Sequence, residues 1–160
     1  MILTVRMNTL QLLNVLQSDP FTKSVFTSVL PSDRLPDTVS EKPRGFIVNV
    51  DSSDGPGTHW VAIYLTRDGE GEFMDSYGQQ PSNYSENFKT FLKNNSSTFS
   101  YNKYVLQSPW SSVCGQYCLF YALHRCRNIP MSTIINMFTN DKEWNDMLVR
   151  DFIRKWFFVQ

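Results

Sequence analysis

Leu106-Gln-Ser-Pro-Trp-Ser-Ser-Val-Cys-Gly-Gln-Tyr-Cys-Leu-Phe-Tyr-Ala-Leu-His124 is the stretch around which the rest of this chain is organised. It runs from the end of a predicted strand, through a loop of small residues, into a helix with almost no polar face, which is typical of a helix buried inside a domain. Cys114 falls where the loop meets the helix. Unpaired backbone N–H groups and the positive end of the helix dipole at such a junction favour thiolate over thiol. The pattern therefore indicates a reactive cysteine on a rigid support.

Cysteine is also a common small core residue, and that is our interpretation of Cys118 and Cys126 on the same helix. Cys114 stands apart from them only if a base and an orienting acid lie elsewhere in the chain. Gly115, directly after it, lacks side-chain bulk that would keep a substrate backbone away from the sulfur.

Composition predicts one globular domain, residues 1–160, because 41% of the 160 residues are hydrophobic and 14% aromatic. The formal net charge is zero, which argues against a strong sequence-independent grip on nucleic acid. No apolar run reaches the roughly 18–20 residues of a membrane helix, and polar residues interrupt the stretch 1–16, so no signal peptide is expected. Three cysteines without paired spacing suit a reducing compartment. We expect an intracellular monomer.

Hydrophobic periodicity and turn residues predict an α+β fold with one central, mostly antiparallel sheet flanked by helices. The predicted helices are 9–19, 21–30, 82–93, 114–124, 130–138 and 141–157, and the predicted strands are 45–50, 59–65, 72–77 and 100–106. Pro130 is expected at the first position of its helix. Asn140 and Glu143 are expected to form a capping box for the last helix.

Two histidines are available as a base for Cys114. His124 lies ten residues further along the same helix, which is about 15 Å at a rise of about 1.5 Å per residue and too far for a hydrogen bond to the sulfur. We interpret His124 as a packing or helix-end residue. His59, which opens a strand after a glycine-rich turn, is the predicted base.

A catalytic imidazole needs an acceptor that fixes its second nitrogen. If residues 59–65 and 72–77 form a hairpin, Asp75 returns beside His59. Asp75 lies among apolar neighbours, where an acid needs a partner. Gln107 ends its strand seven residues before Cys114 and can fold back over the thiolate. Its side-chain NH₂ and the backbone N–H of Cys114 would then stabilise an oxyanion.

These residues resemble a known family. His59-Trp60, the acid of Asp75-Ser-Tyr-Gly78, Gln107-Ser-Pro109 and Cys114-Gly115 with Cys118 are similar to the adenovirus protease (adenain) family, which is related to the SUMO and other ubiquitin-like-protein proteases. The resemblance covers about residues 10–125, and the last 35 residues are unmatched in detail. It implies a papain-like variant of the α+β fold.

The resemblance also implies roles. Cys114 would be the nucleophile, His59 the general base and later acid, and Gln107 the oxyanion donor; Asp75 would orient the imidazole where adenain has a glutamate. Trp60 would pack against the histidine. A narrow cleft over Gly115, Trp60 and Trp110 would bind substrates with small residues, commonly glycine, next to the cut bond.

The implied function is a thiol endopeptidase that matures capsid or core precursor proteins of a virus or virus-like element, in the host cytoplasm or nucleus or packaged in the virion. No cofactor or metal is implied. Adenain is activated by a peptide tethered through a disulfide, but residues 96–106 contain no cysteine, so such a peptide would have to bind without that bond. Adenain also binds DNA, which zero net charge disfavours here.

Three alternatives stay open. An isopeptidase for ubiquitin-like proteins uses the same four residues. A non-catalytic binding module could keep the fold, although the intact set of His59, Asp75, Gln107 and Cys114 argues against it. A metal site formed by His59, His124, Cys114 and Cys118 is the weakest, because no usual zinc-ligand spacing is present.

Overall fold

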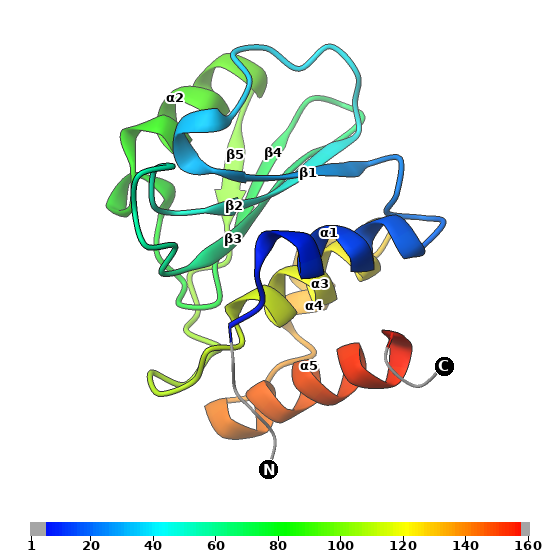
Figure 1. Cartoon of the computed structure of the whole chain (residues 1–160). Coiled ribbons are helices and arrows are strands. Elements are labelled where there is room, and N and C mark those ends of the chain that lie inside the picture. The colour runs from blue at the N-terminus through cyan, green and yellow to red at the C-terminus, as the bar shows by residue number, and fades with distance from the viewer. Residues whose placement is uncertain (1–5, 158–160) are drawn as a thin grey trace.

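The computed structural model describes residues 6–157 and has the predicted α+β fold (Figure 1). Its elements are α1 Thr9–Ser18, β1 Phe26–Pro31, the 3-10 helix η1 Ser32–Arg34, β2 Arg44–Asn49, β3 Trp60–Leu65, β4 Gly71–Met74, η2 Pro81–Asn83, α2 Glu86–Asn95, β5 Phe99–Tyr101, α3 Cys114–Arg125, α4 Met131–Ile135 and α5 Lys142–Phe157. The ends of the predicted domain, residues 1–5 and 158–160, lie outside the described part. Within residues 6–157, every helix is too short or too polar to span a bilayer.

The sheet has the strand order β1-β2-β3-β4-β5. Its central strands β2, β3 and β4 are antiparallel, as predicted. The two edge strands differ, because β1 runs parallel to β2 and β5 runs parallel to β4. Parallel neighbours need a connection that crosses back along the sheet. The loop after η1 makes the first crossover and α2 makes the second.

The helix predicted over residues 21–30 is wrong, since this segment forms a turn followed by the edge strand β1. A bulge explains the error. The register with β2 shifts between Phe26 and Ser28, and such an extra residue displaces the usual alternation of side chains. Phe26 and Val29 consequently both enter the same core cluster. Two buried residues three positions apart on one face, Phe26 and Val29, match the spacing expected of a helix.

Side chains on the two faces of the sheet form two separate cores. One face packs against α1 and α3, and its cluster also takes in Val149 and Ile153 of α5. The other face is covered by α2 through Phe88, Phe91 and Leu92. Figure 1 shows α2 on one side of the sheet and α1, α3 and α4 on the other. β3 lies between both layers and is buried along its whole length.

The last predicted elements are present with shifted ends. β5 covers only 99–101, because Asn102 leaves the ladder and its side chain binds the backbone N–H and C=O of Asp75 instead. Pro130 is the N-cap of α4 rather than its first residue. The capping box predicted from Asn140 and Glu143 is wrong, since a single bond caps this end of α5: the Asp141 side chain accepts from Trp144 N.

Substitution of Gly45 by alanine is expected to destabilise the fold, because the new Cβ would lie 2.3 Å from the Phe26 ring. Overpacking of this kind costs about 1–3 kcal/mol. Urea denaturation should show a lower midpoint with an unchanged slope. A smaller ring-free side chain should relieve the clash, so Phe26→Leu should cost less in the Gly45→Ala background than in the wild type. Equal costs in the two backgrounds would contradict this packing.

Candidate active site

Cys114 is the first residue of α3, with Val113 as the N-cap. The helix behind it is buried from Tyr117 to Leu123, so the thiol stands on a rigid support as the sequence predicts. The three cysteines are free thiols. Cys118 is fully buried one turn further on, and burial raises the pKa of its thiol. Its place fits the interpretation of Cys118 as a core residue.

His59 lies just before β3 and is brought to Asp75, which lies just after β4. His59 Nε2 is 2.6 Å from Asp75 Oδ1, and the two side chains are buried. The hairpin register, in which Ala62 pairs with Met74, sets these strand ends side by side. The predicted neighbourhood of His59 and Asp75 is therefore present in the structure. Since Nε2 is occupied by Asp75, Nδ1 is the nitrogen left for Cys114.

The imidazole and the thiol shift each other's titration in opposite directions. Burial alone lowers the pKa of His59, but hydrogen bonds to Asp75 and Cys114 outweigh burial and raise this pKa to about 9. Burial alone raises the pKa of Cys114, but the hydrogen bond and positive charge of His59 outweigh it and lower the pKa. The start of α3 favours the thiolate as well. The arrangement thus favours a thiolate–imidazolium pair at neutral pH.

Four donors hold the carboxyl group of Asp75. Oδ1 accepts from the backbone N–H of Tyr77 in addition to His59, at 3.1 Å. Oδ2 accepts from the backbone N–H of Gln79 at 2.9 Å and from the hydroxyl of Tyr84 at 2.7 Å. A buried acid is stable only when its oxygens are bonded in this way. The orientation of His59 is thereby fixed through Asp75.

Two tyrosines near the imidazole were missed by the sequence analysis. The rings of Tyr77 and Tyr84 lie 4.9 Å and 5.6 Å from the His59 ring, centroid to centroid. Burial and the adjacent Asp75 raise the pKa of Tyr84, so its hydroxyl keeps the proton that it donates. Nothing in the sequence signals this role, because Tyr84 follows an apolar helical spacing. Packing of Trp60 against His59 stays a prediction.

Gln107 is buried between the sheet and the loop that leads to Cys114. Its Oε1 lies 2.5 Å from Ser76 Oγ, and its Nε2 donates to the carbonyl and hydroxyl oxygens of Ser111 at 3.1 Å and 3.0 Å. The amide group therefore faces the loop that carries the nucleophile. Its role as an oxyanion donor stays a prediction.

The backbone around Gln107 is anchored by α5. Asn145 Nδ2 donates to Leu106 O at 3.0 Å, and Asp146 Oδ1 accepts from Ser108 N at 3.4 Å. The hydroxyl of Tyr117 lies 2.8 Å from Asp146 Oδ1 and 3.2 Å from Leu106 O. Asn145 and Asp146 are buried. These contacts join the loop, α3 and α5, and none of them was predicted.

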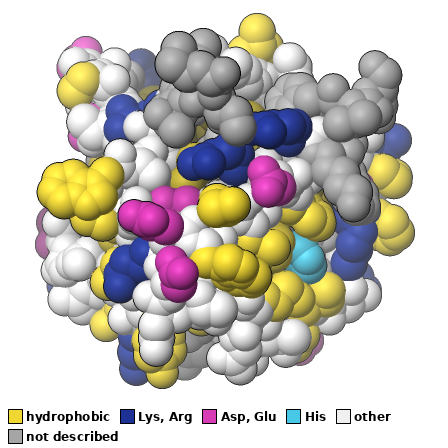
Figure 2. Space-filling model, turned by 90° about the horizontal axis from the view of Figure 1, so that it is seen from below, with side chains coloured by type: hydrophobic (Ala, Val, Ile, Leu, Met, Phe, Trp, Pro, Cys, Tyr) yellow, Lys and Arg dark blue, Asp and Glu magenta, His cyan; other side chains and the backbone are white. Residues whose placement is uncertain are grey.

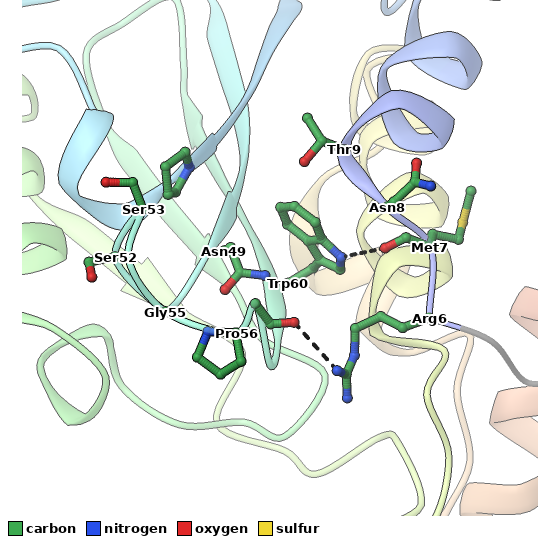
Figure 3. A pocket seen from close by; sticks show the side chains of 12 residues that line it. Arg6, Met7, Asn8, Thr9, Asn49, Ser52, Ser53, Gly55, Pro56 and Trp60 are labelled. Carbon is green, nitrogen blue, oxygen red and sulfur yellow. Dashed lines mark hydrogen bonds between the residues drawn. The ribbon is translucent and has the colours of Figure 1, made fainter.

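A cleft of about 510 Å³ opens between the N-terminal segment and the loop from β2 to β3 (Figure 3). Trp60 lines it and donates from Nε1 to Met7 O at 2.8 Å. Arg6 Nη1 reaches Gly57 O across the cleft at 3.4 Å. Asp51 Oδ2 holds the opposite wall by accepting from Gly57 N and Thr58 N. Trp60, predicted to bind substrate, thus lies in the cleft.

The other two predicted substrate-binding residues have different surroundings. The side-chain position of Gly115 faces Leu12 at 3.1 Å and Met7 at 3.3 Å, so its lack of a side chain allows α3 to pack against α1. Trp110 lies on the loop between Gln107 and α3 and is 89% exposed. It is outside the lining of the Trp60 cleft. A contact of Gly115 or Trp110 with substrate stays a prediction.

The alternative metal site draws on His59, Cys114, Cys118 and His124. Residues 6–157 contain no group of three or more His, Cys, Asp and Glu side chains placed to hold a metal ion. His124 Nδ1 is 2.7 Å from Phe120 O, one turn back on α3, and its ring packs against Phe120 and Phe152. His124 is therefore a packing residue near the end of the helix, as interpreted from the sequence.

Charges of both signs are mixed on the surface seen in Figure 2. This view is from below, the side on which α5 lies in Figure 1, and basic side chains there lie close to acidic ones and to apolar patches. The chain as a whole has 15 Lys and Arg against 15 Asp and Glu. A uniformly basic face, which sequence-independent nucleic-acid binding requires, is not visible among the described residues of this view.

Comparison with known proteins places this site in context. No protein-family model matches the chain. It is 31% identical over 107 residues to "Putative thiol protease R355" of Acanthamoeba polyphaga mimivirus, a match that covers 62% of this chain and 35% of the relative. The matched region therefore spans about a third of that relative's length.

Two solved structures are similar to this one. The ASFV pS273R protease matches 66% of this chain and 43% of its own at 26% identity, with a TM-score of 0.42. ChlaDub1 from Chlamydia trachomatis matches 62% of this chain and 46% of its own at 17% identity, with a TM-score of 0.47.

The site and the comparisons point to the same chemistry. A buried histidine that is bonded to an acid and lies near a cysteine at the start of a buried helix is an arrangement that activates a thiol nucleophile. The chain is similar to a protein described as a thiol protease and has the predicted α+β fold. Its resemblance to cysteine proteases is thereby confirmed.

Alkylation of Cys114 by iodoacetamide should show the lowered pKa directly. At pH 6 the wild type should react at least about tenfold faster than His59→Ala, because each unit of pKa changes the thiolate fraction about tenfold and His59 lowers the pKa of Cys114. The difference should shrink as the pH rises, because the thiol of His59→Ala then ionises as well. Peptide mapping by mass spectrometry locates the label. His124→Ala is the matched control and should keep the wild-type profile; identical profiles for all three proteins would refute the pair.

Proposed function

We propose that this chain is the catalytic part of a thiol endopeptidase that cleaves precursor proteins of a virus or virus-like element at sites with small, glycine-containing sequences. The contact of 2.6 Å between His59 Nε2 and Asp75 Oδ1, with Cys114 close enough to the same ring for the two groups to shift each other's pKa, is the observation that supports it most. Acyl transfer from an amide to sulfur needs an acid, an imidazole and a thiol in this order. The similarity to a mimivirus protein described as a thiol protease supports both the reaction and the viral setting.

The reaction follows from the geometry. The Cys114 thiolate attacks the substrate carbonyl carbon, and the oxygen becomes an oxyanion that the N–H of Cys114 and the amide of Gln107 stabilise. His59, which is charged at neutral pH, gives its proton to the leaving amine. A water molecule then loses a proton to His59 and attacks the thioester, which releases the acid and restores the thiolate. None of these steps needs a cofactor.

The cleft lined by Trp60, the residue after His59, supports a preference for small residues. The Trp60 ring and the segment from Arg6 to Thr9 narrow it, while Gly55, Pro56 and Gly57 form the opposite wall. A polypeptide in an extended conformation fits such a slot when the residues next to the cut bond carry little side chain. The walls are close because Arg6 and Gly57 are joined by a hydrogen bond.

The free thiols support a location in a reducing compartment. A free Cys114 must stay reduced to react, and three free cysteines suit a reducing compartment. We therefore place the enzyme in the cytoplasm or nucleus of a host cell or inside the virion, acting as a monomer on protein substrates. Residues 96–106 contain no cysteine, so an activating peptide, if one is used, binds without a disulfide to this segment.

Incubation with a peptide library, read by mass spectrometry, tests the activity and its specificity together. We expect cuts after small residues, with glycine at one or both of the two positions before the cut, and no cuts by Cys114→Ala. The same variant should lose iodoacetamide labelling at position 114. Cleavage by Cys114→Ala would refute the proposal. Release of a reporter from ubiquitin-like substrates, without cutting of capsid-type peptides, would favour the isopeptidase instead.

Substitutions of His59 and Asp75 should lower kcat by different factors. His59→Ala should lower kcat on the order of 10⁴-fold or more, because it removes both the base and the acid. Asp75→Ala should cost roughly ten- to a hundredfold less, because orientation is a secondary contribution. Asp68→Ala, on the exposed turn between β3 and β4, is the matched acid control and should retain full activity. A greater loss in Asp75→Ala than in His59→Ala would overturn these roles.

A further inference from the structure

Ser76 holds the amide of Gln107 in one orientation. Ser111 O is a carbonyl oxygen that only accepts hydrogen bonds, so the end of Gln107 that faces it at 3.1 Å is the NH₂ group. The opposite end is then Oε1, which also only accepts. The Ser76 hydroxyl, 2.5 Å away, is consequently the donor. Without this hydroxyl, Oε1 would be left buried with no partner.

The backbone of Ser76 holds the same residue. Ser76 O accepts from Leu106 N at 2.8 Å and from Gln107 N at 3.0 Å. Ser76 is 1% exposed and Gln107 is 1% exposed, so water does not compete for these bonds. Both the main chain and the side chain of Gln107 are therefore fixed by one residue of the turn after β4.

Ser76 directly follows Asp75, which orients His59. We propose that Ser76 is a positioning residue that aims the Gln107 NH₂ at the oxyanion, so that two consecutive residues after β4 orient the base and the oxyanion donor. The role of the NH₂ in stabilising an oxyanion rests on the proposed function. The orientation of the amide by Ser76 does not.

The amide keeps a donor for the substrate. Both acceptors of Gln107 Nε2 belong to Ser111, its carbonyl oxygen at 3.1 Å and its hydroxyl at 3.0 Å. One N–H can serve two acceptors on one residue as a three-centre bond. The second N–H is then available to the oxyanion. If the amide turned over, its oxygen would meet the oxyanion instead and repel it.

Kinetics of Ser76→Ala test the role. We expect kcat on a cleaved peptide to fall about ten- to a hundredfold, with KM changed less than about twofold, because an oxyanion forms only after binding. Iodoacetamide should label Cys114 at the wild-type rate, since alkylation forms no oxyanion. In the Gln107→Ala background, Ser76→Ala should not lower kcat any further. Ser96→Ala is the matched control, because it removes a hydroxyl that donates to Leu92 O at the end of α2.

A measurement that needs no cleavage separates this inference from the proposed function. With ¹⁵N-labelled glutamine, the side-chain NH₂ signals missing from Gln107→Ala identify Gln107. Their exchange with solvent should be at least about tenfold faster in Ser76→Ala than in wild type or Ser96→Ala. An unchanged exchange rate of the Gln107 NH₂ group in Ser76→Ala overturns the inference. An equal loss of kcat from Ser76→Ala in the wild type and in Gln107→Ala overturns it as well. Faster exchange in a protein that cleaves no peptide refutes the proposed function alone.

Discussion

The hydrogen bond between His59 and Asp75 is the contact on which the site depends. A fully buried carboxyl group is stable only if donors surround it, and Asp75 is 0% exposed. The short turn between β3 and β4 meets this demand, because its register brings the start of one strand beside the end of the other. The chain beyond Asp75 then curls around the carboxyl group, so that the N–H groups of Tyr77 and Gln79 point at it.

Cys114 reaches this pair through packing alone. α3 lies against β3 on one side and α1 on the other, and Gly115 lets α1 approach to within 3.1 Å of its side-chain position. A sulfur fixed in this way does not depend on a mobile loop. The opposing pKa shifts of His59 and Cys114 follow from that fixed proximity, since each charge stabilises the other.

The sequence was sufficient where contacts are local or follow a short hairpin. The helix that begins at Cys114, the strands of the hairpin and the pairing of His59 with Asp75 could all be predicted, because a turn of a few residues fixes the register of its strands. The strand β1 could not, since a bulge gave it the spacing of a helix. Tyr84 and Asn102, which hold Asp75, come from segments whose local patterns say only that they are a helix and a strand.

The C-terminal helix shows why a resemblance in one region leaves part of a site undescribed. The resemblance to adenain ends near Arg125, yet Asn145 and Asp146 of α5 bind the backbone on both sides of Gln107. The carbonyl of Leu106 and the N–H of Ser108 are buried there, and buried backbone groups need partners. Any chain that places Gln107 in this way must supply such partners from some element. Here that element is α5, so a helix beyond the stretch that carries the resemblance helps to orient the loop between Gln107 and Cys114.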